Sequence, residues 1–160
     1  MEPLQHRTDE NSPIVKHGEN LRNPFKPTAA FIGVSWFALL AGVTGYCIGL
    51  WNATMELNEK GYYFTILLFG LFAVISVQKI VRDRAEGFAV TDLYYGLSWF
   101  ATIAAMILLT IGLWNADLAR SEKGFYAMAF LLSLFGAIAV QKNTRDTGGA
   151  PKGTVLSDME

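Results

Sequence analysis

The sequence predicts an all-α membrane protein whose four transmembrane helices form two tandem hairpins arranged as parallel repeats. Two observations support this fold class. Residues 31–83 align with residues 94–146 at a constant offset of 63 without a gap, and 25 of the 53 aligned positions are identical. Each copy contains two long segments without a charged residue, separated by a short polar turn. A fixed internal period is typical of folds whose repeated units cannot bury their apolar surface alone.

Four segments that carry no Asp, Glu, Lys or Arg are long enough to cross a bilayer. A transmembrane helix needs about 20 mostly apolar residues, and about 17 suffice. The segments are Thr28–Met55, Gly61–Gln78, Leu93–Ala116 and Gly124–Gln141, with 28, 18, 24 and 18 residues. They predict helices over about 29–53, 59–81, 92–116 and 122–144. A soluble bundle is the alternative, but helices that are apolar on every face offer no side to water.

The remaining segments are polar and divide the chain into five parts. We expect a tail at 1–28, a first repeat at 29–83, a link at 84–91, a second repeat at 92–146 and a tail at 147–160. The second tail is too polar to bury enough apolar surface to fold alone. The first tail lacks an early apolar run with a cleavage site, so we expect the first span to direct membrane insertion.

Lysine and arginine residues beside the spans set the expected orientation. The two tails and the link with its flanks hold ten of these residues, whereas the two hairpin turns hold three. Because positively charged flanks stay in the cytoplasm, we expect both termini and the link to be cytoplasmic. The expected cytoplasmic anchors are Lys79, Arg82, Lys142 and Arg145. The two repeats would then share one orientation and be related by an axis along the membrane normal.

The two turns carry the densest identity between the copies. Trp-Asn-Ala ends the first helix of each copy, and Glu-Lys-Gly followed by aromatic residues opens the second. The candidate outer-turn motif comprises Trp51, Asn52, Glu59, Lys60, Gly61 and Tyr63 with their copies Trp114, Asn115, Glu122, Lys123, Gly124 and Tyr126. Two interpretations are open. The motif either builds the hairpin, or it forms a small polar site at the outer surface from Asn52, Glu59, Lys60 and their copies.

Hairpin construction accounts for most of this motif. Asn58 and Ser121 suit the N-cap positions of the second helices. The glutamate that follows each would lie in the first helical turn, where the helix dipole favours a negative charge. Gly61 and Gly124 would let the backbone of the opposite helix approach closely. The tryptophans and tyrosines would anchor the chain at the two membrane boundaries.

Small residues at a spacing of four predict where helices pack closely. The candidate packing residues are Ala41, Gly45, Gly49, Gly112, Ala129, Ser133 and Ala137. Such stripes let two membrane helices approach, either within one subunit or between subunits. In the second copy of the first helix, Leu108 interrupts the stripe. The pattern therefore leaves open whether the repeats pack within one chain or swap between chains.

The predicted spans offer no chemistry for catalysis or ion coupling. They hold no Asp, Glu, Lys, Arg or His, which pumps and coupled transporters place inside the membrane. His6 and His17 lie in the first tail, and the single cysteine, Cys47, lies in the first span. We therefore expect no metal site, no cofactor and no catalytic base. The span hydroxyls are expected to bond to their own helix or a neighbouring one. A net charge of −1 gives no reason to expect nucleic-acid binding.

The sequence GLWNA, followed by EKGYY or EKGFY and then by VQK and RD, occurs in both copies and resembles the YiaA/YiaB-type bacterial inner membrane proteins. The resemblance covers about residues 29–146. It implies a multi-pass protein of the bacterial inner membrane without an established reaction, substrate or cofactor. Because the spans combine close-packing residues with no ionisable group, we expect a non-enzymatic protein of the lipid bilayer that acts by assembly, as a homo-oligomer or with a membrane-protein partner. The alternative is an oligomeric channel or facilitator for a small solute.

Overall fold

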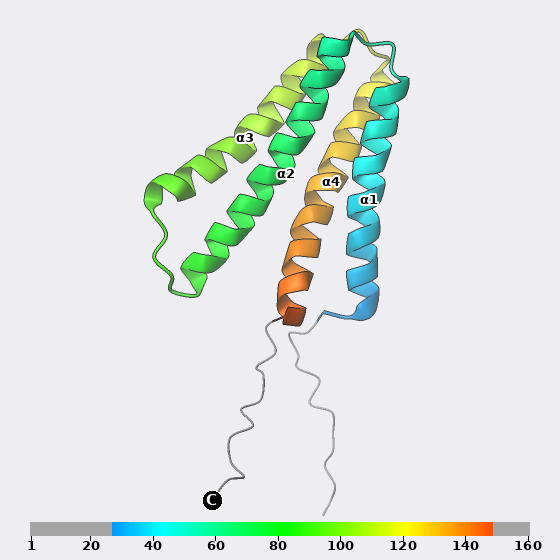
Figure 1. The fold of residues 1–160 in the computed structure, drawn as a ribbon. Coiled ribbons are helices and arrows are strands. Elements are labelled where there is room, and N and C mark those ends of the chain that lie inside the picture. Colours follow the sequence, from blue (N-terminus) through cyan, green and yellow to red (C-terminus); the bar gives the residue numbers. More distant parts are fainter. Residues whose placement is uncertain (1–26, 149–160) are drawn as a thin grey trace, which may run out of the picture.

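The structure is a computed structural model that describes residues 27–148, and this part of the chain contains four helices and no strand (Figure 1). The helices are α1 Ala29–Asn52, α2 Leu57–Ala85, α3 Asp92–Asn115 and α4 Arg120–Gly148. Each is long and apolar enough to cross a membrane. The prediction of four transmembrane helices in two repeats is therefore confirmed. The predicted tails lie almost wholly outside the described residues.

Local chemistry sets the helix boundaries at the turns. The prediction of N-caps at Asn58 and Ser121 is wrong. α2 begins at Leu57 with Glu56 as its N-cap, and α4 begins at Arg120, so both side chains lie in the first turn. The glutamate of the motif instead accepts a hydrogen bond from the backbone N–H just before each helix. The Glu59 carboxylate accepts a hydrogen bond from the backbone N–H of Glu56 at 3.0 Å. The copy Glu122 makes the same bond, over 2.8 Å, with the backbone N–H three residues before it.

The link between the repeats is short and held by polar contacts. Gly87 follows α2 with a φ of 80°, a left-handed conformation that glycine adopts without strain. Arg84 pairs with Asp92 at the start of α3, and its guanidinium carbon lies 4.1 Å from the centre of the Tyr95 ring. These contacts tie the end of the first repeat to the beginning of the second.

The two repeats run in the same direction. Both hairpin turns lie at one end of the molecule, here called the turn end (Figure 1). The start of α1, the end of α4 and the link lie at the opposite end, here called the terminal end. This arrangement agrees with the predicted parallel repeat.

The closest packing joins helices of different repeats. α1 packs along α4, α2 packs along α3, and α2 also meets α4, whereas the two helices of each hairpin touch only sparsely. The offset of 63 residues maps α1 onto α3 and α2 onto α4. The close pair of α1 with α4 is therefore equivalent to the close pair of α3 with α2. The repeats thus exchange helices within one chain about a pseudo-two-fold axis that passes beside α2 and α4. This resolves how the repeats pack, which the sequence left open.

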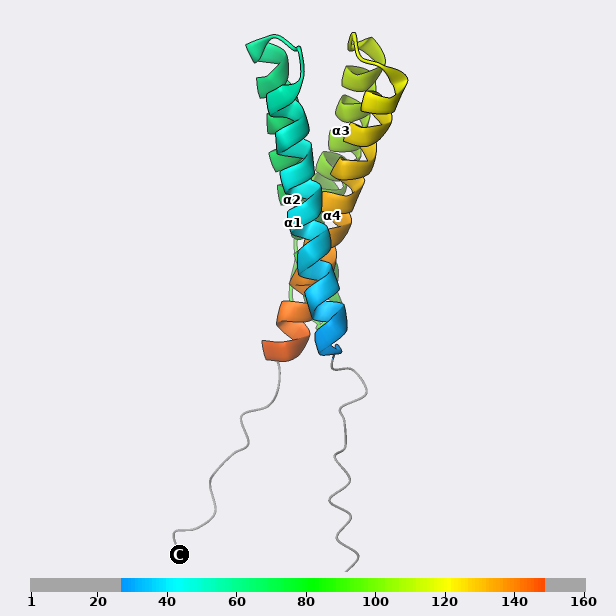
Figure 2. The ribbon, with the colours of Figure 1, turned by 90° about the vertical axis from the view of Figure 1, so that its right-hand side faces the viewer.

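Glycines bring the backbones of α1 and α4 together. A Cβ atom added to Gly42 would lie 2.7 Å from the backbone nitrogen of Ser133, and one added to Gly136 would lie 2.6 Å from the Cα of Leu39. The helices cross here and diverge toward the turn end, where the two turns stand apart (Figure 2). Large side chains fill the space that opens above the crossing, so residue size changes along the interface with the distance between the backbones.

An aromatic cluster occupies this space. Tyr46 and Phe130 are fully buried. The Tyr46 ring meets the Tyr126 ring edge to face with 5.5 Å between centroids, and Tyr63 stacks on Tyr126 at 6.3 Å. The Tyr46 hydroxyl donates a hydrogen bond to the backbone carbonyl of Tyr63 at 3.1 Å, which satisfies its polar group. The cluster draws on α1, α2 and α4, so it joins both repeats.

The predicted packing residues divide into two groups. Ala129, Ser133 and Ala137 of α4 are buried, and the Gly42–Ser133 approach lies among them. On α1, Ala41 is exposed and a Cβ on Gly45 would meet only a ring atom of Phe125 at 3.9 Å. The buried residues of α1 are instead Ser35, Ala38, Gly42, Tyr46 and Leu50. The helix turns this row inward because it carries Tyr46, the large side chain that fills the core. The predicted row lies at its edge, where Gly45 and Gly49 are half-buried and only Gly49 closely meets another helix.

The close approach predicted at Gly61 and Gly124 is also wrong. A Cβ added to either glycine would meet nothing within 4 Å. The reason is the exchange of helices, because the chain that packs against α2 or α4 comes from the other repeat rather than from across its own turn. The glycines that do receive a neighbouring helix at the turn end are Gly49 and Gly112.

Candidate functional site

Within each turn, the polar side chains of the outer-turn motif bond to nearby backbone. Lys60 donates to the carbonyl of Trp51 at 3.1 Å, and Lys123 donates to that of Trp114 at 3.2 Å. Each lysine thereby satisfies a carbonyl in the last turn of the preceding helix, which has no partner within the helix itself. Asn52 and its copy each donate to the carbonyl four residues earlier, at 2.9 and 2.8 Å. The same bonds recur in both copies, as hairpin construction requires.

Aromatic residues of each EKGYY or EKGFY segment pack against the glycine of the GLWNA segment in the other repeat. A Cβ on Gly112 would lie 2.7 Å from the Cε1 of Tyr62 and 3.2 Å from the hydroxyl of Tyr63. Its copy Gly49 faces Phe125 and Tyr126 in the same way, at 2.7 and 3.3 Å. The GLWNA segment of one repeat therefore receives the EKGYY or EKGFY segment of the other. This contact gives a physical reason for both segments to recur together.

Two tryptophans project from the turn end. Trp51 is 84% exposed and Trp114 is 83% exposed, so neither side chain contributes to the core. An amphipathic ring at the end of an apolar helix suits the boundary between lipid and water. Their placement agrees with membrane anchoring and offers no enclosed cage for a ligand.

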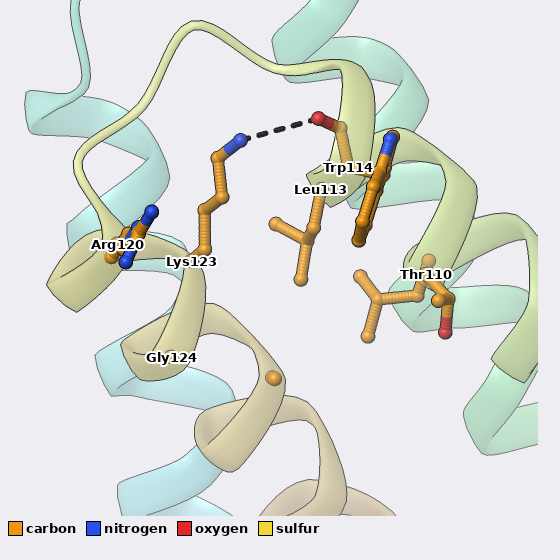
Figure 3. Close-up of a pocket in the computed structure, with 8 residues that line it drawn as sticks. Thr110, Leu113, Trp114, Arg120, Lys123 and Gly124 are labelled. Carbon is orange, nitrogen blue, oxygen red and sulfur yellow. Dashed lines mark hydrogen bonds between the residues drawn. The ribbon is translucent and has the colours of Figure 1, made fainter.

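A groove of about 660 Å³ opens between α3 and α4 at the turn end (Figure 3). We call it the α3–α4 groove, and its lining residues are Leu109, Thr110, Leu113, Trp114, Arg120, Lys123, Gly124 and Ala127. Figure 3 shows Lys123 reaching across to the carbonyl of Trp114, with Leu113 beneath. The walls are mostly apolar, and the two cations come from the first turn of α4. The groove exists because the two helices of this hairpin stand apart. Its apolar walls suit an acyl chain or an apolar side chain.

A smaller pocket of about 240 Å³ lies between the start of α2 and the end of α3. It brings Glu59 and Tyr63 of one motif beside Asn115 of the other. The Glu59 carboxylate and the Asn115 amide already make the capping bonds described above. Asn52 and Lys60 do not line this pocket. The predicted polar site is therefore only partly assembled, and its polar groups are engaged in structure.

Hydroxyl groups in the spans also bond to their own helices. The donors to the carbonyl four residues earlier are Ser35, Ser76, Ser98, Thr102, Thr110 and Ser133. This agrees with the expectation for hydroxyls in apolar helices. Residues 27–148 also contain no group of three or more His, Cys, Asp or Glu that could hold a metal ion. The described spans thus present few uncommitted polar groups.

Sequence reasoning missed a buried polar pair between α1 and α4. Asn143 is 2% exposed, and its amide donates to the hydroxyl of Ser35 at 2.9 Å. The Asn143 carbonyl oxygen is buried and has no hydrogen-bond partner in the described part of the chain. The only signal for this pair was a difference between the copies, since the position equivalent to Asn143 is Ile80 in the first repeat.

The predicted anchors lie at the terminal end. Lys79, Arg82 and Arg145 line a pocket of about 370 Å³ between α2 and α4, together with Asp83, Gln141 and Thr144. We call it the terminal pocket. Lys142 is exposed and does not line it. The sequence identified these cations but not their convergence, because the contact between α2 and α4 depends on the exchange of helices.

Both repeats match a known family, and three known proteins are similar to parts of the chain. Residues 31–83 and 94–146 each match the yiaA/B two helix domain. Inner membrane protein YiaA of Escherichia coli is 55% identical over 132 residues, which cover 82% of this chain and 91% of that protein. Inner membrane protein YiaB of the same organism is 27% identical over 106 residues, covering 64% and 88%. Uncharacterized membrane protein YubF of Bacillus subtilis is 45% identical over 60 residues, covering 37% and 69%.

No solved structure matches the chain significantly. The four apolar helices and the similarity to YiaA make it a multi-pass inner membrane protein. The two matches to the domain fall on the two helix pairs that exchange partners here. By this match over both repeats, the chain belongs to the yiaA/B two helix domain family.

Proposed function

We propose that this protein is a non-enzymatic assembly protein that acts through helix packing with a second copy or with another membrane protein. The observation that carries the proposal is the open side of the second hairpin. Because α3 and α4 pack mainly on helices of the other repeat, a groove of about 660 Å³ remains between them. Membrane helices associate by van der Waals packing, and a concave apolar surface is suited to receive a side chain of another helix.

The distribution of burial supports the same proposal. Of the most apolar 18 residues in each helix, 22% are buried in α1 and in α3, against 39% in α2 and 50% in α4. α1 and α3 are therefore the outer helices, and most of their surface is available to lipid or to a partner. Each is linked by a short turn to an inner helix, so a partner that occupies an open hairpin would contact one outer and one inner helix.

The chemistry of the described residues gives less support to catalysis or transport. Span hydroxyls bond to their own helices, and both motif lysines bond to backbone carbonyls. A nucleophile needs a base within hydrogen-bond reach, and a solute path needs uncommitted polar groups along its length. The channel alternative thus has no specific contact in its favour.

The proposal can be tested by filling the groove. Ala127 lines it, whereas the neighbouring Met128 is 68% exposed and lies outside it. Native mass spectrometry of the gently extracted chain should detect a homo-oligomer or a stoichiometric partner. Ala127→Trp should reduce that complex at least tenfold, and Met128→Trp should leave it intact. A purely monomeric wild-type chain, or an equal loss in both variants, would refute the proposal. Solute flux through liposomes containing the pure protein would instead favour the channel.

A further inference from the structure

The terminal pocket is built by one face of α2 and one face of α4. α2 contributes Lys79, Arg82 and Asp83, which are spaced by three and four residues and so lie on the same side of a helix. α4 contributes Gln141, Thr144 and Arg145 at the same spacing. Two helices of different repeats thus present their polar ends to a common space of about 370 Å³.

Two of the lining residues are copies of each other. Arg145 is the residue equivalent to Arg82 at the offset of 63. They line one pocket because α2 and α4 meet beside the pseudo-two-fold axis. The axis therefore brings two guanidinium groups from opposite helices into the same space, and Lys79 adds a third positive charge.

The lining does not balance these charges. Asp83 is the only carboxylate among the lining residues. Arg82 also pairs with Glu86, one turn further along α2. Within residues 27–148, Lys79 and Arg145 form no ion pair. Like charges that converge beside an apolar medium repel one another, and an anion placed between them removes the repulsion.

Helix-dipole compensation explains only part of this arrangement. Cations in the last turns of α2 and α4 are favourable wherever their side chains point. Arg84 is such a cation, since it lies in the last turn of α2 and does not line the pocket. Dipole compensation therefore accounts for the presence of cations but not for the convergence of three of them on one cavity.

One lining residue also carries a polar atom without a partner. The amide oxygen of Gln141 is buried without a hydrogen bond in the described structure. The oxygen and nitrogen of an amide exchange places by a rotation of the side chain, so Gln141 can present donors to a ligand. The pocket thus combines guanidinium forks, an ammonium group and an uncommitted amide, which together suit a phosphate group.

We propose that the terminal pocket binds a phosphate group, supplied by an anionic phospholipid or by a free phosphate anion. The pocket begins where the uncharged segments end, at Gln78 and Gln141, which is the depth of lipid headgroups. Basic pockets between transmembrane helices are suited to such headgroups. This binding does not depend on the assembly function proposed above.

The test compares lipids and free phosphate on the full-length chain. The purified protein is mixed with phosphatidylglycerol or phosphatidylcholine, and retained lipid is measured by native mass spectrometry together with the thermal midpoint. Phosphatidylglycerol should be retained preferentially and should raise the midpoint. Arg145→Gln should weaken its retention about tenfold, since a charge-assisted hydrogen bond is lost. Lys142→Gln removes the same charge outside the pocket and should have little effect.

The remaining measurements distinguish a lipid headgroup from a free phosphate anion. They also distinguish a specific site from a general effect of charge. Loss of the lipid on adding millimolar inorganic phosphate, with a midpoint raised by phosphate alone, would identify a free anion as the ligand. Persistence of the lipid would identify the headgroup. If Arg145→Gln fails to fold, Arg82→Gln and the charge-conserving Arg145→Lys replace it. Equal retention of the two lipids with no shift by phosphate would overturn the proposal, as would equal losses in Arg145→Gln and Lys142→Gln.

Discussion

Gly49 of the first repeat packs against Tyr126 of the second, and a Cβ atom at Gly49 would lie 3.3 Å from the Cε1 of Tyr126. Gly112 and Tyr63 form the equivalent contact with the roles of the repeats reversed. The GLWNA segment and the EKGYY or EKGFY segment are thus neighbours in sequence within one repeat but partners in space across two. A change in either half alters a contact with the other repeat, which explains why both copies share this pattern.

Replacing Gly112 by leucine should destabilise the fold. The new side chain would meet Tyr62 at 2.7 Å and Tyr63 at 3.2 Å, so both rings would have to move. Overpacking of this kind costs about 1–3 kcal/mol. The midpoint of thermal unfolding in detergent should fall, and Gly61→Leu is the matched control because its Cβ would meet nothing within 4 Å. Equal midpoints for the two variants would contradict the interlocking of the motifs.

Gly136→Ala should be more harmful than its small size suggests. The added methyl group would overlap the backbone of Leu39, which cannot move aside as the end of a ring can. α1 and α4 would have to separate along the crossing, at a cost of about 1–3 kcal/mol. Gly124→Ala serves as the control, since it meets nothing and gains about 0.5–1 kcal/mol of helix propensity. A raised unfolding midpoint for Gly136→Ala would show that the helices are not in contact here.

The number, direction and approximate bounds of the helices could be predicted because each depends on local sequence. Length and polarity define a span, and a constant offset defines a parallel repeat. Which helices pack together could not be predicted in this way. The motif residues would satisfy the same turn bonds whether α1 packed on α2 or on α4. Only contacts such as Gly42 with Ser133 distinguish the two arrangements, and several overlapping rows of small residues were equally plausible.

In the candidate site, too, local features could be predicted but contacts between helices could not. The local roles of the turn glutamates and lysines follow from helix-end chemistry, although the N-cap position was misplaced by two residues in α2. The terminal pocket requires Arg82 and Arg145 to face each other, which depends on the position of the pseudo-two-fold axis. Sequence spacing alone places a residue on a face of its helix but does not tell which helix it meets.

Asn143→Ile should leave the stability unchanged or increase it. The Asn143 amide bonds to Ser35, but its carbonyl oxygen is buried without a partner in the described chain, which costs about 1–3 kcal/mol. A hydrogen bond between membrane helices returns only about 0.6 kcal/mol on average. The first repeat already holds Ile80 at this position, with Ser98 at the position equivalent to Ser35. Thermal unfolding would test this, and Asn143→Ala should destabilise because it leaves a cavity. A marked loss of stability in Asn143→Ile would instead assign the asparagine an essential polar role.

Cysteine cross-linking should distinguish exchange within one chain from packing within each hairpin. Asn143 of α4 contacts Ser35 of α1, with 2.9 Å between the amide nitrogen and the hydroxyl. In a Cys47→Ala background, the pair Ser35→Cys and Asn143→Cys should therefore react with a short thiol cross-linker. The matched control is Ser98→Cys with Asn143→Cys, because Ser98 is the copy of Ser35 on the other helix of the same hairpin.

The product of that reaction identifies the arrangement by its size on a denaturing gel and by the pair that forms it. Exchange within one chain requires a cross-linked monomer from the first pair and little product from the control. Reaction of the control pair instead would place α3 against α4 and remove the basis for the α3–α4 groove. A cross-linked dimer from the first pair would mean that α1 and α4 meet between two chains. The repeats would then be swapped between subunits, and the pseudo-two-fold axis would relate helices of different protomers.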